Sequence, residues 1–402
     1  MSSENLSLKR KVLFTSIIAG LLIGFVEILL QGYYFLNAGD FLFRRHGLPI
    51  NIADEIRGYA SKPNLEYRHA TNEFDYTIFT NDQGYRTGSD RPHYAYEKDA
   101  DTYRIIAMGP SFTFGWANDY EYIYPTLIGE KIRVPGKKVE VINVGTGGQG
   151  TIAQSCWLER EGYKFQPDLV LMTSYGSTPT PMGSGCPEGG VRPAIVVDGH
   201  LHLRQPSLAL RARSFFKNFA VVFYSFYVYT ALGPEDEATY VDAGKELYSD
   251  EERSLTDDKG LVDSYLAFQN LFADKIGSHG DLVFLHIPMS FMVHPNDVKR
   301  WAGLVDFGER GVTGFRQTTQ RQLAALREGS VEIVDTTPEL IRRAEQDRVF
   351  FWLDIHLTET GNEAVTDAMM PTLQNVVDLR YGGRGSENSR ESDTGRSIAS
   401  YH

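Results

Sequence analysis

The chain has 402 residues, of which 42% are hydrophobic, and it carries a formal net charge of −12. A chain of this length and composition can bury a large core in one large domain or two, which excludes disorder throughout. Nucleic-acid binding is excluded as well, because phosphate recognition needs a concentrated basic surface and the sequence shows none.

An apolar stretch near the N-terminus predicts a membrane anchor. A basic cluster at residues 9–11 precedes a mostly apolar segment at 12–36, which is long enough to cross a bilayer. A cleaved signal peptide is the alternative, but its apolar region normally has about 7 to 15 residues, and residues 36–38 offer a poor cleavage site. We therefore expect an uncleaved single-pass anchor, with residues 1–11 in the cytoplasm and the main domain in the periplasm or outside the cell.

Two polar residues interrupt the apolar segment. Glu27 and Gln31 lie four residues apart, so a helix places them on one face, toward the outer end of the span. A carboxyl group inside a membrane is costly and invites a partner. The side chain of Glu27 is expected to snorkel to the interface, to face the chain's own outer domain, or to contact another membrane protein.

The segment after the anchor leads into a regular α/β pattern. Residues 37–102 form a membrane-proximal linker and lead-in segment, with strand-like alternation at 74–79 and a turn at 81–84. From residue 103 to residue 379, strands alternate with helices at a spacing typical of parallel βαβ units. The expected strands lie at 104–108, 139–144, 168–173, 282–288 and 331–335, and the expected helices at 121–132, 151–162, 261–276, 315–327 and 360–377.

An insertion at about 180–260 interrupts this pattern. Residues 194–203 predict a hairpin that turns at Asp-Gly. The aromatic-rich stretch at 215–227 predicts a helix too short for a comfortable membrane span. Core packing is its first expected role, and a lid, a contact with the membrane surface and a protein interface are the alternatives. The polar tail at 380–402 has a composition typical of disorder.

A serine after an apolar run is the first candidate for chemistry. Residues 105–108 fit a buried strand, Gly109 permits a tight turn, and Pro110 is tolerated at the first position of a helix. Ser111 would then begin a helix, where its own N–H and the helix dipole can stabilise a developing oxyanion. The triplet at 354–356, Asp-Ile-His, could supply its base, although a simple helix cap would leave the same pattern.

Four blocks, in this order, resemble the SGNH (GDSL-like) hydrolase superfamily, in particular its membrane-anchored members associated with cell-envelope carbohydrate. The resemblance covers about residues 74–377 and implies a three-layer, flavodoxin-like α/β fold, with a parallel sheet flanked by helices, after one transmembrane helix. The blocks are Gly109-Pro110-Ser111-Phe112-Thr113-Phe114-Gly115, Asn143-Val144-Gly145-Thr146-Gly147-Gly148-Gln149-Gly150, Gly176-Ser177, and Asp354-Ile355-His356 with Gly361 after it; residues 80–86 resemble the lead-in segment of the same subgroup.

The resemblance also assigns roles to residues. It implies Ser111 as nucleophile, His356 as general base and then acid, and Asp354 as the group that orients the imidazole. The oxyanion hole would use the N–H groups of Ser111 and Gly145 and an asparagine side chain, for which this sequence has Ser177. A second departure is Pro110, where the family has aspartate. A single oxyanion donor is worth roughly 100- to 1,000-fold in turnover.

Two functional hypotheses follow. The first is a membrane-anchored, extracytoplasmic esterase or transferase that acts on O-acyl (acetyl) groups of carbohydrate through Ser111. The alternative is a catalytically impaired domain that serves as a structural subunit of a multiprotein membrane complex, either an envelope-polysaccharide machine or an energy-transducing assembly. Besides the bilayer around 12–36, membrane-protein partners would then bind near Glu27, near Phe215–Tyr229 and at the C-terminal tail.

The remaining cysteines and histidines predict no cofactor or metal site. Cys156 and Cys186 are too few for a disulfide scaffold; they pair if the domain lies outside the cytoplasm, or otherwise stay small buried residues. His200 and His202 share one face of the hairpin without a third ligand nearby. His286 is expected in the core with its ring hydrogen-bonded. No phosphate loop, dinucleotide fingerprint or zinc signature occurs.

Overall fold

A computed structural model gives the structure of the chain. It describes residues 7–38, 41–44, 50–71, 73–192, 195–197, 200–202, 207–216, 218–225, 258–298, 311–352 and 354–381. The Asp-Gly turn of the expected hairpin, the insertion between residues 226 and 257 and the tail from residue 382 lie outside the described residues.

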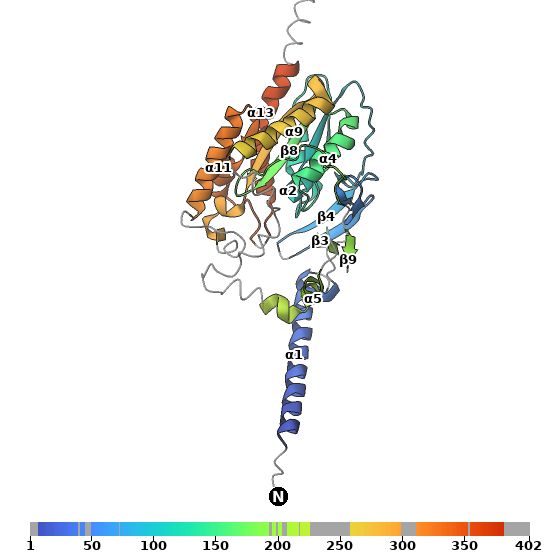
Figure 1. Cartoon of the computed structure of the whole chain (residues 1–402), viewed down its shortest axis with the longest axis vertical. Helices are drawn as coiled ribbons and strands as arrows, with labels where there is room; N and C mark the ends of the chain where they lie inside the picture. The colour runs from blue at the N-terminus through green and yellow to red at the C-terminus, as the bar shows by residue number, and fades with distance from the viewer. Residues whose placement is uncertain are drawn as a thin grey trace, which may run out of the picture. The chain divides into compact units, whose positions relative to one another are not determined.

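The described residues form two compact units. The first holds the long helix α1 (Leu8–Ala38), the 3-10 turn η1 (Leu42–Arg44), the hairpin β9 (Ile195–Val197) and β10 (His200–His202), helix α5 (Leu208–Phe216) and a further helical stretch at 220–225. Within α1, Leu8–Leu36 contains an 18-residue window with a mean hydropathy of 2.4 and is long and apolar enough to cross a membrane (Figure 1).

The second unit is built on an eight-stranded sheet in the order β12-β11-β8-β6-β7-β5-β4-β3. The five strands from β12 to β7 run parallel, which confirms the expected βαβ units. The bounds are β3 (Glu66–Ala70), β4 (Asp75–Thr80), β5 (Arg86–Thr87), β6 (Thr102–Met108), β7 (Lys138–Asn143), β8 (Leu169–Gly176), β11 (Asp281–Pro288) and β12 (Ile333–Asp335).

The sheet is antiparallel at one edge, in the lead-in segment. β5 pairs antiparallel with β7, and β4 pairs antiparallel with β5. The short turn between β4 and β5 explains the direction, because parallel neighbours need a crossover of about a dozen residues or more and a tight turn joins antiparallel strands. The lead-in segment thus extends the sheet, and it also holds the hairpin β1 (Asn51–Asp54) and β2 (Gly58–Ser61).

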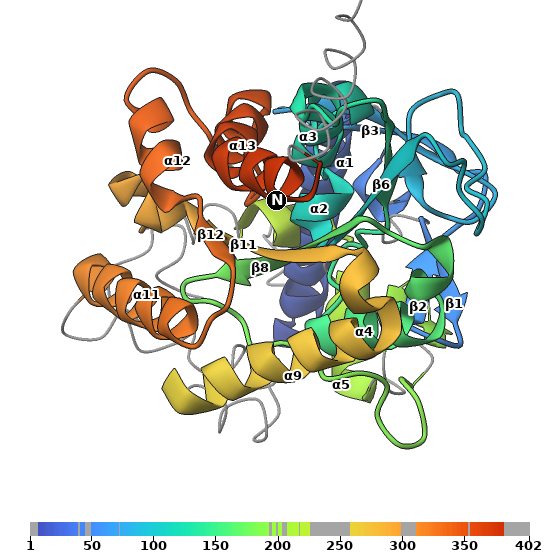
Figure 2. The ribbon, with the colours of Figure 1, turned by 90° about the horizontal axis from the view of Figure 1, so that it is seen from above.

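Helices cover both faces of the sheet, as the three-layer prediction requires (Figures 1 and 2). Alternate residues of β8 show the division: Val170 and Met172 pack into one hydrophobic cluster, and Leu169 and Leu171 into another. Helices α4 (Thr151–Arg160), α9 (Asp258–Ile276) and α11 (Gly311–Glu328) contribute to the first cluster; α3 (Tyr124–Lys131), α12 (Thr337–Ala344) and α13 (Glu359–Tyr381) contribute to the second.

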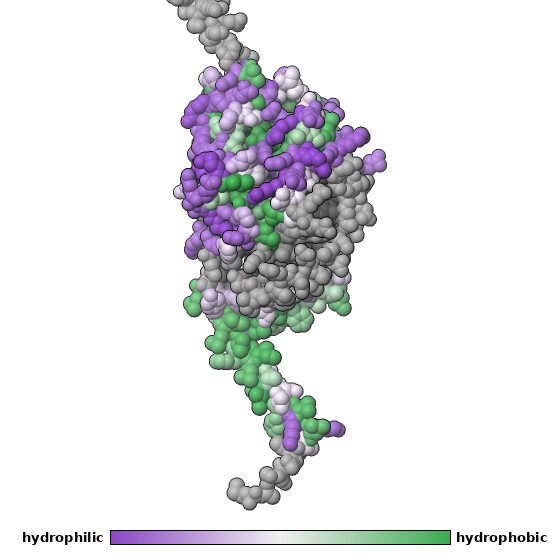
Figure 3. All heavy atoms as spheres, turned by 90° about the vertical axis from the view of Figure 1, so that its left-hand side faces the viewer, coloured by the Kyte–Doolittle hydropathy of each residue, from purple (hydrophilic) through white to green (hydrophobic). Residues whose placement is uncertain are grey.

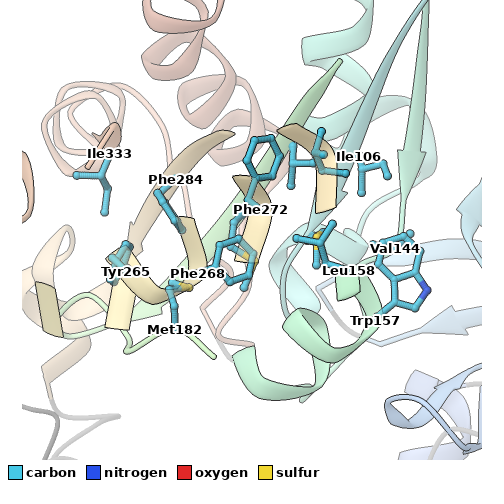
Figure 4. Packing of buried hydrophobic residues seen from close by; sticks show 14 of the residues in the cluster. Ile106, Val144, Trp157, Leu158, Met182, Tyr265, Phe268, Phe272, Phe284 and Ile333 are labelled. Carbon is cyan, nitrogen blue, oxygen red and sulfur yellow. The ribbon is translucent and has the colours of Figure 1, made fainter. Parts of the chain in front are cut away.

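The first of these clusters is aromatic at its centre. Tyr265 and Phe268 of α9 pack on Phe284 of β11, with ring centroids 4.7 and 5.7 Å apart (Figure 4). Burial of such side chains contributes about 1.5–3 kcal/mol each to stability. The remaining short elements are α2 (Ser111–Phe114), η2 (Tyr120–Tyr122), η3 (Gly162–Phe165), η5 (Gly277–His279), η6 (Ser290–Met292) and η7 (Pro295–Asp297).

The cysteines and the core histidine have definite places. Cys156 of α4 is buried and forms a disulfide with Cys186, so the pairing alternative applies. His286 lies in β11 and is fully buried, but neither ring nitrogen has a hydrogen-bond partner among the described residues, so the expectation of a hydrogen-bonded ring was wrong. Burial lowers the pKa of His286 to about 4.

Candidate active site

Ser111 begins α2 directly after the buried strand β6. Pro110 precedes it in an extended conformation, at φ −74°, which its ring favours, and the Pro110 carbonyl accepts the N–H groups of Thr113 and Phe114 at 3.0 and 3.1 Å. A side chain at Gly109 would collide with Thr113 and Thr173, so only glycine permits this close turn. The strand, turn and helix therefore present Ser111 at the carboxyl edge of the parallel strands.

His356 and Asp354 meet Ser111 from the other end of the sequence. The Nε2 atom of His356 lies 2.6 Å from the Ser111 Oγ. Its Nδ1 atom forms a short hydrogen bond with Asp354 Oδ1, which also accepts the His356 backbone N–H at 2.9 Å. The three residues predicted as a triad thus form one continuous hydrogen-bonded chain, in the order that a nucleophile, its base and an orienting acid require.

The surroundings keep this chain largely out of water. His356 is buried, and the rings of Phe112 and Trp116 lie against its imidazole at centroid distances of 4.8 and 5.8 Å. Burial raises the pKa of Asp354, but the hydrogen bond and charge of His356 outweigh it, so the pKa of Asp354 lies below its usual value. Asp354 is therefore ionised at neutral pH and can hold the imidazole in one orientation.

Glu73 fixes the loop that carries Asp354. One carboxylate oxygen, Oε1, accepts the backbone N–H of Trp352 at 2.6 Å, and the other, Oε2, accepts the N–H of Asp354 at 2.9 Å. Charge-assisted hydrogen bonds of this kind are about twice as strong as neutral ones. Glu73 precedes β4, so a residue of the lead-in segment positions the triad acid.

A second link to the base runs through a buried arginine. The guanidinium of Arg86 in β5 donates to the carbonyl of Asn118 at 3.2 Å and to carbonyls of its own sheet edge, and burial lowers the pKa of Arg86 to about 10. The Asn118 side chain in turn donates to the carbonyl of Leu357, next to His356, at 2.8 Å. Sequence reasoning missed Glu73 and Asn118, and no local pattern marks either residue.

The oxyanion side is less complete than the base side. The Gly145 N–H donates to the side-chain oxygen of Asn143 at 3.0 Å, so this predicted donor is already engaged. A side chain at Gly145 would collide with the backbone at Thr113 and Phe114, and close packing against α2 is the role that the structure gives this glycine. Gly147 also passes close to the nucleophile, since a Cβ built on it would lie 3.9 Å from the Ser111 Cβ.

Ser177, the third predicted oxyanion donor, follows β8 in the next loop. Its carbonyl accepts the hydroxyl of Thr319 at 2.7 Å, which ties the loop to α11. Among the described residues, the structure records no hydrogen bond between the Ser177 hydroxyl and the triad. The structure therefore brings Ser111, His356 and Asp354 together and leaves Ser177 outside that hydrogen-bonded chain.

The groups at the triad define the chemistry that this site can support. Within the described ranges, no three residues among His, Cys, Asp and Glu are grouped so that they could hold a metal ion. His200 and His202 lie in β10, in the other unit. The arrangement at Ser111 can remove a proton from a hydroxyl and return it to a leaving group, which is the chemistry of ester hydrolysis and acyl transfer.

Comparison with known proteins gives a fold likeness only. No family model and no curated protein matches the sequence. A member of the lipolytic protein G-D-S-L family from Veillonella parvula is 11% identical over 67% of this chain and 96% of its own, with a TM-score of 0.34. The acetylxylan esterase Axe2 from Geobacillus stearothermophilus is 9% identical over 67% and 94%, with a TM-score of 0.36. LAE5, an alpha/beta hydrolase enzyme from the metagenome of Lake Arreo, Spain, is 12% identical over 70% and 98%, with a TM-score of 0.36. The chain is similar in fold to these solved lipolytic and esterase structures.

Proposed function

We propose that the chain is a membrane-anchored serine hydrolase that cleaves or transfers O-acyl groups outside the cytoplasm. The single observation that carries the proposal is the continuous hydrogen-bonded chain from Ser111 Oγ through His356 to Asp354. A serine hydroxyl is a weak nucleophile without a base, and a histidine serves as that base when an acceptor fixes its tautomer. This arrangement is what a serine esterase or acyltransferase needs.

The proposed reaction has two steps, acylation of Ser111 and deacylation, and His356 acts first as base and then as acid in each. Ser111 Oγ attacks the ester carbonyl while His356 Nε2 takes the hydroxyl proton. The tetrahedral intermediate collapses, the leaving alcohol takes that proton from His356, and the acyl group stays on Ser111 as an ester. Water then attacks with His356 as base and releases the acid, or an acceptor hydroxyl does so and receives the acyl group. The resemblance to the envelope subgroup favours acetyl groups of carbohydrate as the substrate.

Two features support the proposed location. Helix α1 has the length and hydropathy of a membrane span, with a basic cluster at its N-terminal end that favours a cytoplasmic N-terminus. The disulfide between Cys156 and Cys186 suits an oxidising compartment on the opposite side. We therefore place the α/β unit in the periplasm or outside the cell.

A fluorophosphonate probe tests the nucleophile. Such a probe phosphonylates an activated serine, so the wild-type chain should be labelled and Ser111→Ala should not, while Ser155→Ala, which removes another hydroxyl of the same unit, should label as the wild type does. Labelling that survives in Ser111→Ala, or a wild-type chain that is never labelled, contradicts the proposal.

One observation favours the alternative, a catalytically impaired domain that serves as a subunit of a membrane complex. The Gly145 N–H is bound to Asn143, and Ser177 replaces the amide that the resemblance leads us to expect. Without these two donors the site would not stabilise the negative charge of the tetrahedral intermediate, so turnover would be negligible even though the triad is intact. Absence of labelling together with co-purification of stoichiometric membrane proteins would favour this alternative.

A further inference from the structure

Glu27 and Gln31 of α1 both form hydrogen bonds with the chain's own insertion. The two carboxylate oxygens of Glu27 each accept a backbone N–H at 2.8 Å, one from Ala220 and one from Val221. Gln31 donates to Glu27 at 2.7 Å and to the carbonyl of Asn218 at 3.1 Å. Of the sequence alternatives for Glu27, contact with the chain's own outer part is the one that the structure shows.

The bonded backbone groups belong to the start of a helix. The helical stretch at 220–225 begins with the residues whose N–H groups bind Glu27, and the first N–H groups of a helix have no partner within it. A carboxylate at this end also favours the helix dipole. Each group thus meets the hydrogen-bonding need of the other directly.

The depth of these contacts follows from the length of the anchor. A hydrocarbon core of about 30 Å takes about 20 helical residues, and counted from the basic cluster these run from Val12 to about Gln31. Glu27 then lies about one helical turn inside the outer edge of the hydrocarbon, where an unpaired carboxylate or N–H group costs several kcal/mol. The contacts of Glu27 remove both costs, which is the arrangement expected of a segment that enters the edge of the membrane.

Several outward side chains of the same segment are large and apolar. Phe215 is 60% exposed, Phe216 56%, Phe219 39% and Val222 42%. The rings of Tyr33 and Tyr34 hold the segment against α1, through Tyr224 and Phe223 respectively, at centroid distances of 5.8 and 5.9 Å. Apolar surface extends along α1 and around its C-terminal end (Figure 3).

A pocket of about 500 Å³ lies between the helix and this segment. Its polar lining residues, Glu27, Gln31 and Asn218, already form hydrogen bonds with the chain, so the open lining is chiefly aromatic and aliphatic. Exposed apolar side chains beside a membrane anchor match the acyl chains of a lipid surface.

We propose that residues 207–216 and 218–225, here called the collar, lie in the outer interface of the bilayer as a second membrane contact beside α1. Lipid acyl chains cover the exposed apolar residues of the collar, Leu208 among them, and fill the pocket, and Glu27 holds the collar against the anchor. This inference rests on the proposed membrane anchoring. It changes the role first expected for the aromatic stretch from core packing to lipid contact.

Spin-label accessibility in lipid nanodiscs tests the collar in the full-length chain. The two native cysteines are joined, so a single introduced cysteine takes the nitroxide. Phe216→Cys and Phe219→Cys report on the collar, Leu22→Cys on the middle of the anchor, and Tyr163→Cys on an exposed position in η3 of the α/β unit. Collision rates with oxygen, which concentrates in lipid, and with a water-soluble nickel chelate give the depth of each label in discs of phosphatidylcholine and phosphatidylglycerol.

The expected ratio of oxygen to nickel collisions at residues 216 and 219 is several-fold above that at residue 163 and below that at residue 22. A high ratio at residue 22 with water-like ratios at 216 and 219 overturns the collar and leaves the anchor intact. A water-like ratio at residue 22 overturns the membrane anchoring itself. Labels at 216 and 219 that are shielded from both reagents show that protein covers the surface, which also overturns lipid contact.

Substitution of Glu27 tests whether it holds the collar against the anchor. Glu27→Ala removes both acceptors and should lower the collision ratio at residue 219 toward the water value, with no change at residue 22. Glu27→Gln keeps one side-chain oxygen and should give a smaller drop. A ratio at residue 219 that is the same in Glu27→Ala and the unsubstituted background overturns this role of Glu27. Fluorophosphonate labelling of Ser111 provides the folding check for both variants.

Discussion

The two sides of Ser111 are built to different degrees. On the base side, His356, Asp354 and Glu73 form an unbroken series of hydrogen bonds that runs from the nucleophile into the lead-in segment. On the oxyanion side, one predicted donor, the Gly145 N–H, is bound to Asn143. A fold can therefore form a complete triad without a complete oxyanion hole, because the oxyanion hole needs N–H donors that no other group of the protein already binds.

The largest expected effect is on the base side. His356→Gln should lower the second-order rate constant for fluorophosphonate labelling by about 100- to 10,000-fold, because no general base then takes the Ser111 proton. His279→Gln, on the exposed turn η5, is the matched control and should label at the wild-type rate. Equal rates in the two variants would show that the 2.6 Å contact between His356 and Ser111 is not used in the chemistry.

The oxyanion side should respond to the opposite kind of change. Ser177→Asn supplies the amide that the resemblance leads us to expect, and it should raise kcat for an activated acetyl ester toward the roughly 100-fold that one donor is worth. Ser177→Ala should leave kcat where it is. If Ser177→Asn gives no gain, another group supplies the third donor, for example the Gly147 N–H. The oxyanion side is then as complete as the base side.

Glu73 tests how far the base side depends on its support. Glu73→Gln keeps one acceptor oxygen and loses the other, so the loop at Asp354 loses one of its two ties. We expect the labelling rate to fall about 10-fold, because small displacements of catalytic groups are costly, with little change in Tm. Glu130→Gln, exposed on α3, is the control for removal of a charge. A loss of Tm without a loss of rate would assign Glu73 to stability alone.

The smallest expected effect on labelling belongs to His286, which is buried away from this chain of groups. The pKa of His286 is about 4 in the folded chain, below its usual 6.5. Between pH 4 and pH 6.5, the imidazole is therefore protonated in the unfolded chain and neutral in the folded chain. The free energy of unfolding should therefore fall as the pH drops from 6.5 to 4, by up to about 1.4 kcal/mol per pH unit. Urea titrations across this range should show a shallower decline in His286→Leu than in the wild type. Equal declines would contradict a low pKa.

Sequence patterns predicted the framework of the site but not its supports. Ser111 and the triplet at 354–356 could be found because each follows or precedes a regular element at a fixed offset. Glu73 and Asn118 could not be found in this way, because the residues that they bind lie more than 200 positions away in the sequence. Local sequence patterns carry no information about such contacts. The bond from Gly145 to Asn143 depends on a side-chain rotamer, which motif spacing does not determine.

The same reasoning explains the misses in the fold. The parallel strands were predictable because long apolar runs mark strands that are buried on both faces. Strand β5 has two residues, too few for any periodicity to be seen, and with it the antiparallel edge escaped prediction. Helix α12 carried a usable signal, since Thr336 and Pro338 begin a short amphipathic stretch, but its charge-rich composition is also that of a loop.

The buried Arg86 has a consequence for how the protein opens. Its guanidinium bonds carbonyls of the sheet edge and of Asn118, whose side chain holds the carbonyl beside His356. If any one of these segments unfolded alone, the buried guanidinium would lose hydrogen-bond acceptors without gaining water. The lead-in strands and the loop of His356 should therefore unfold as one cooperative unit. Their amide protons would exchange with solvent at a common rate, slower than those of the exposed turns around them.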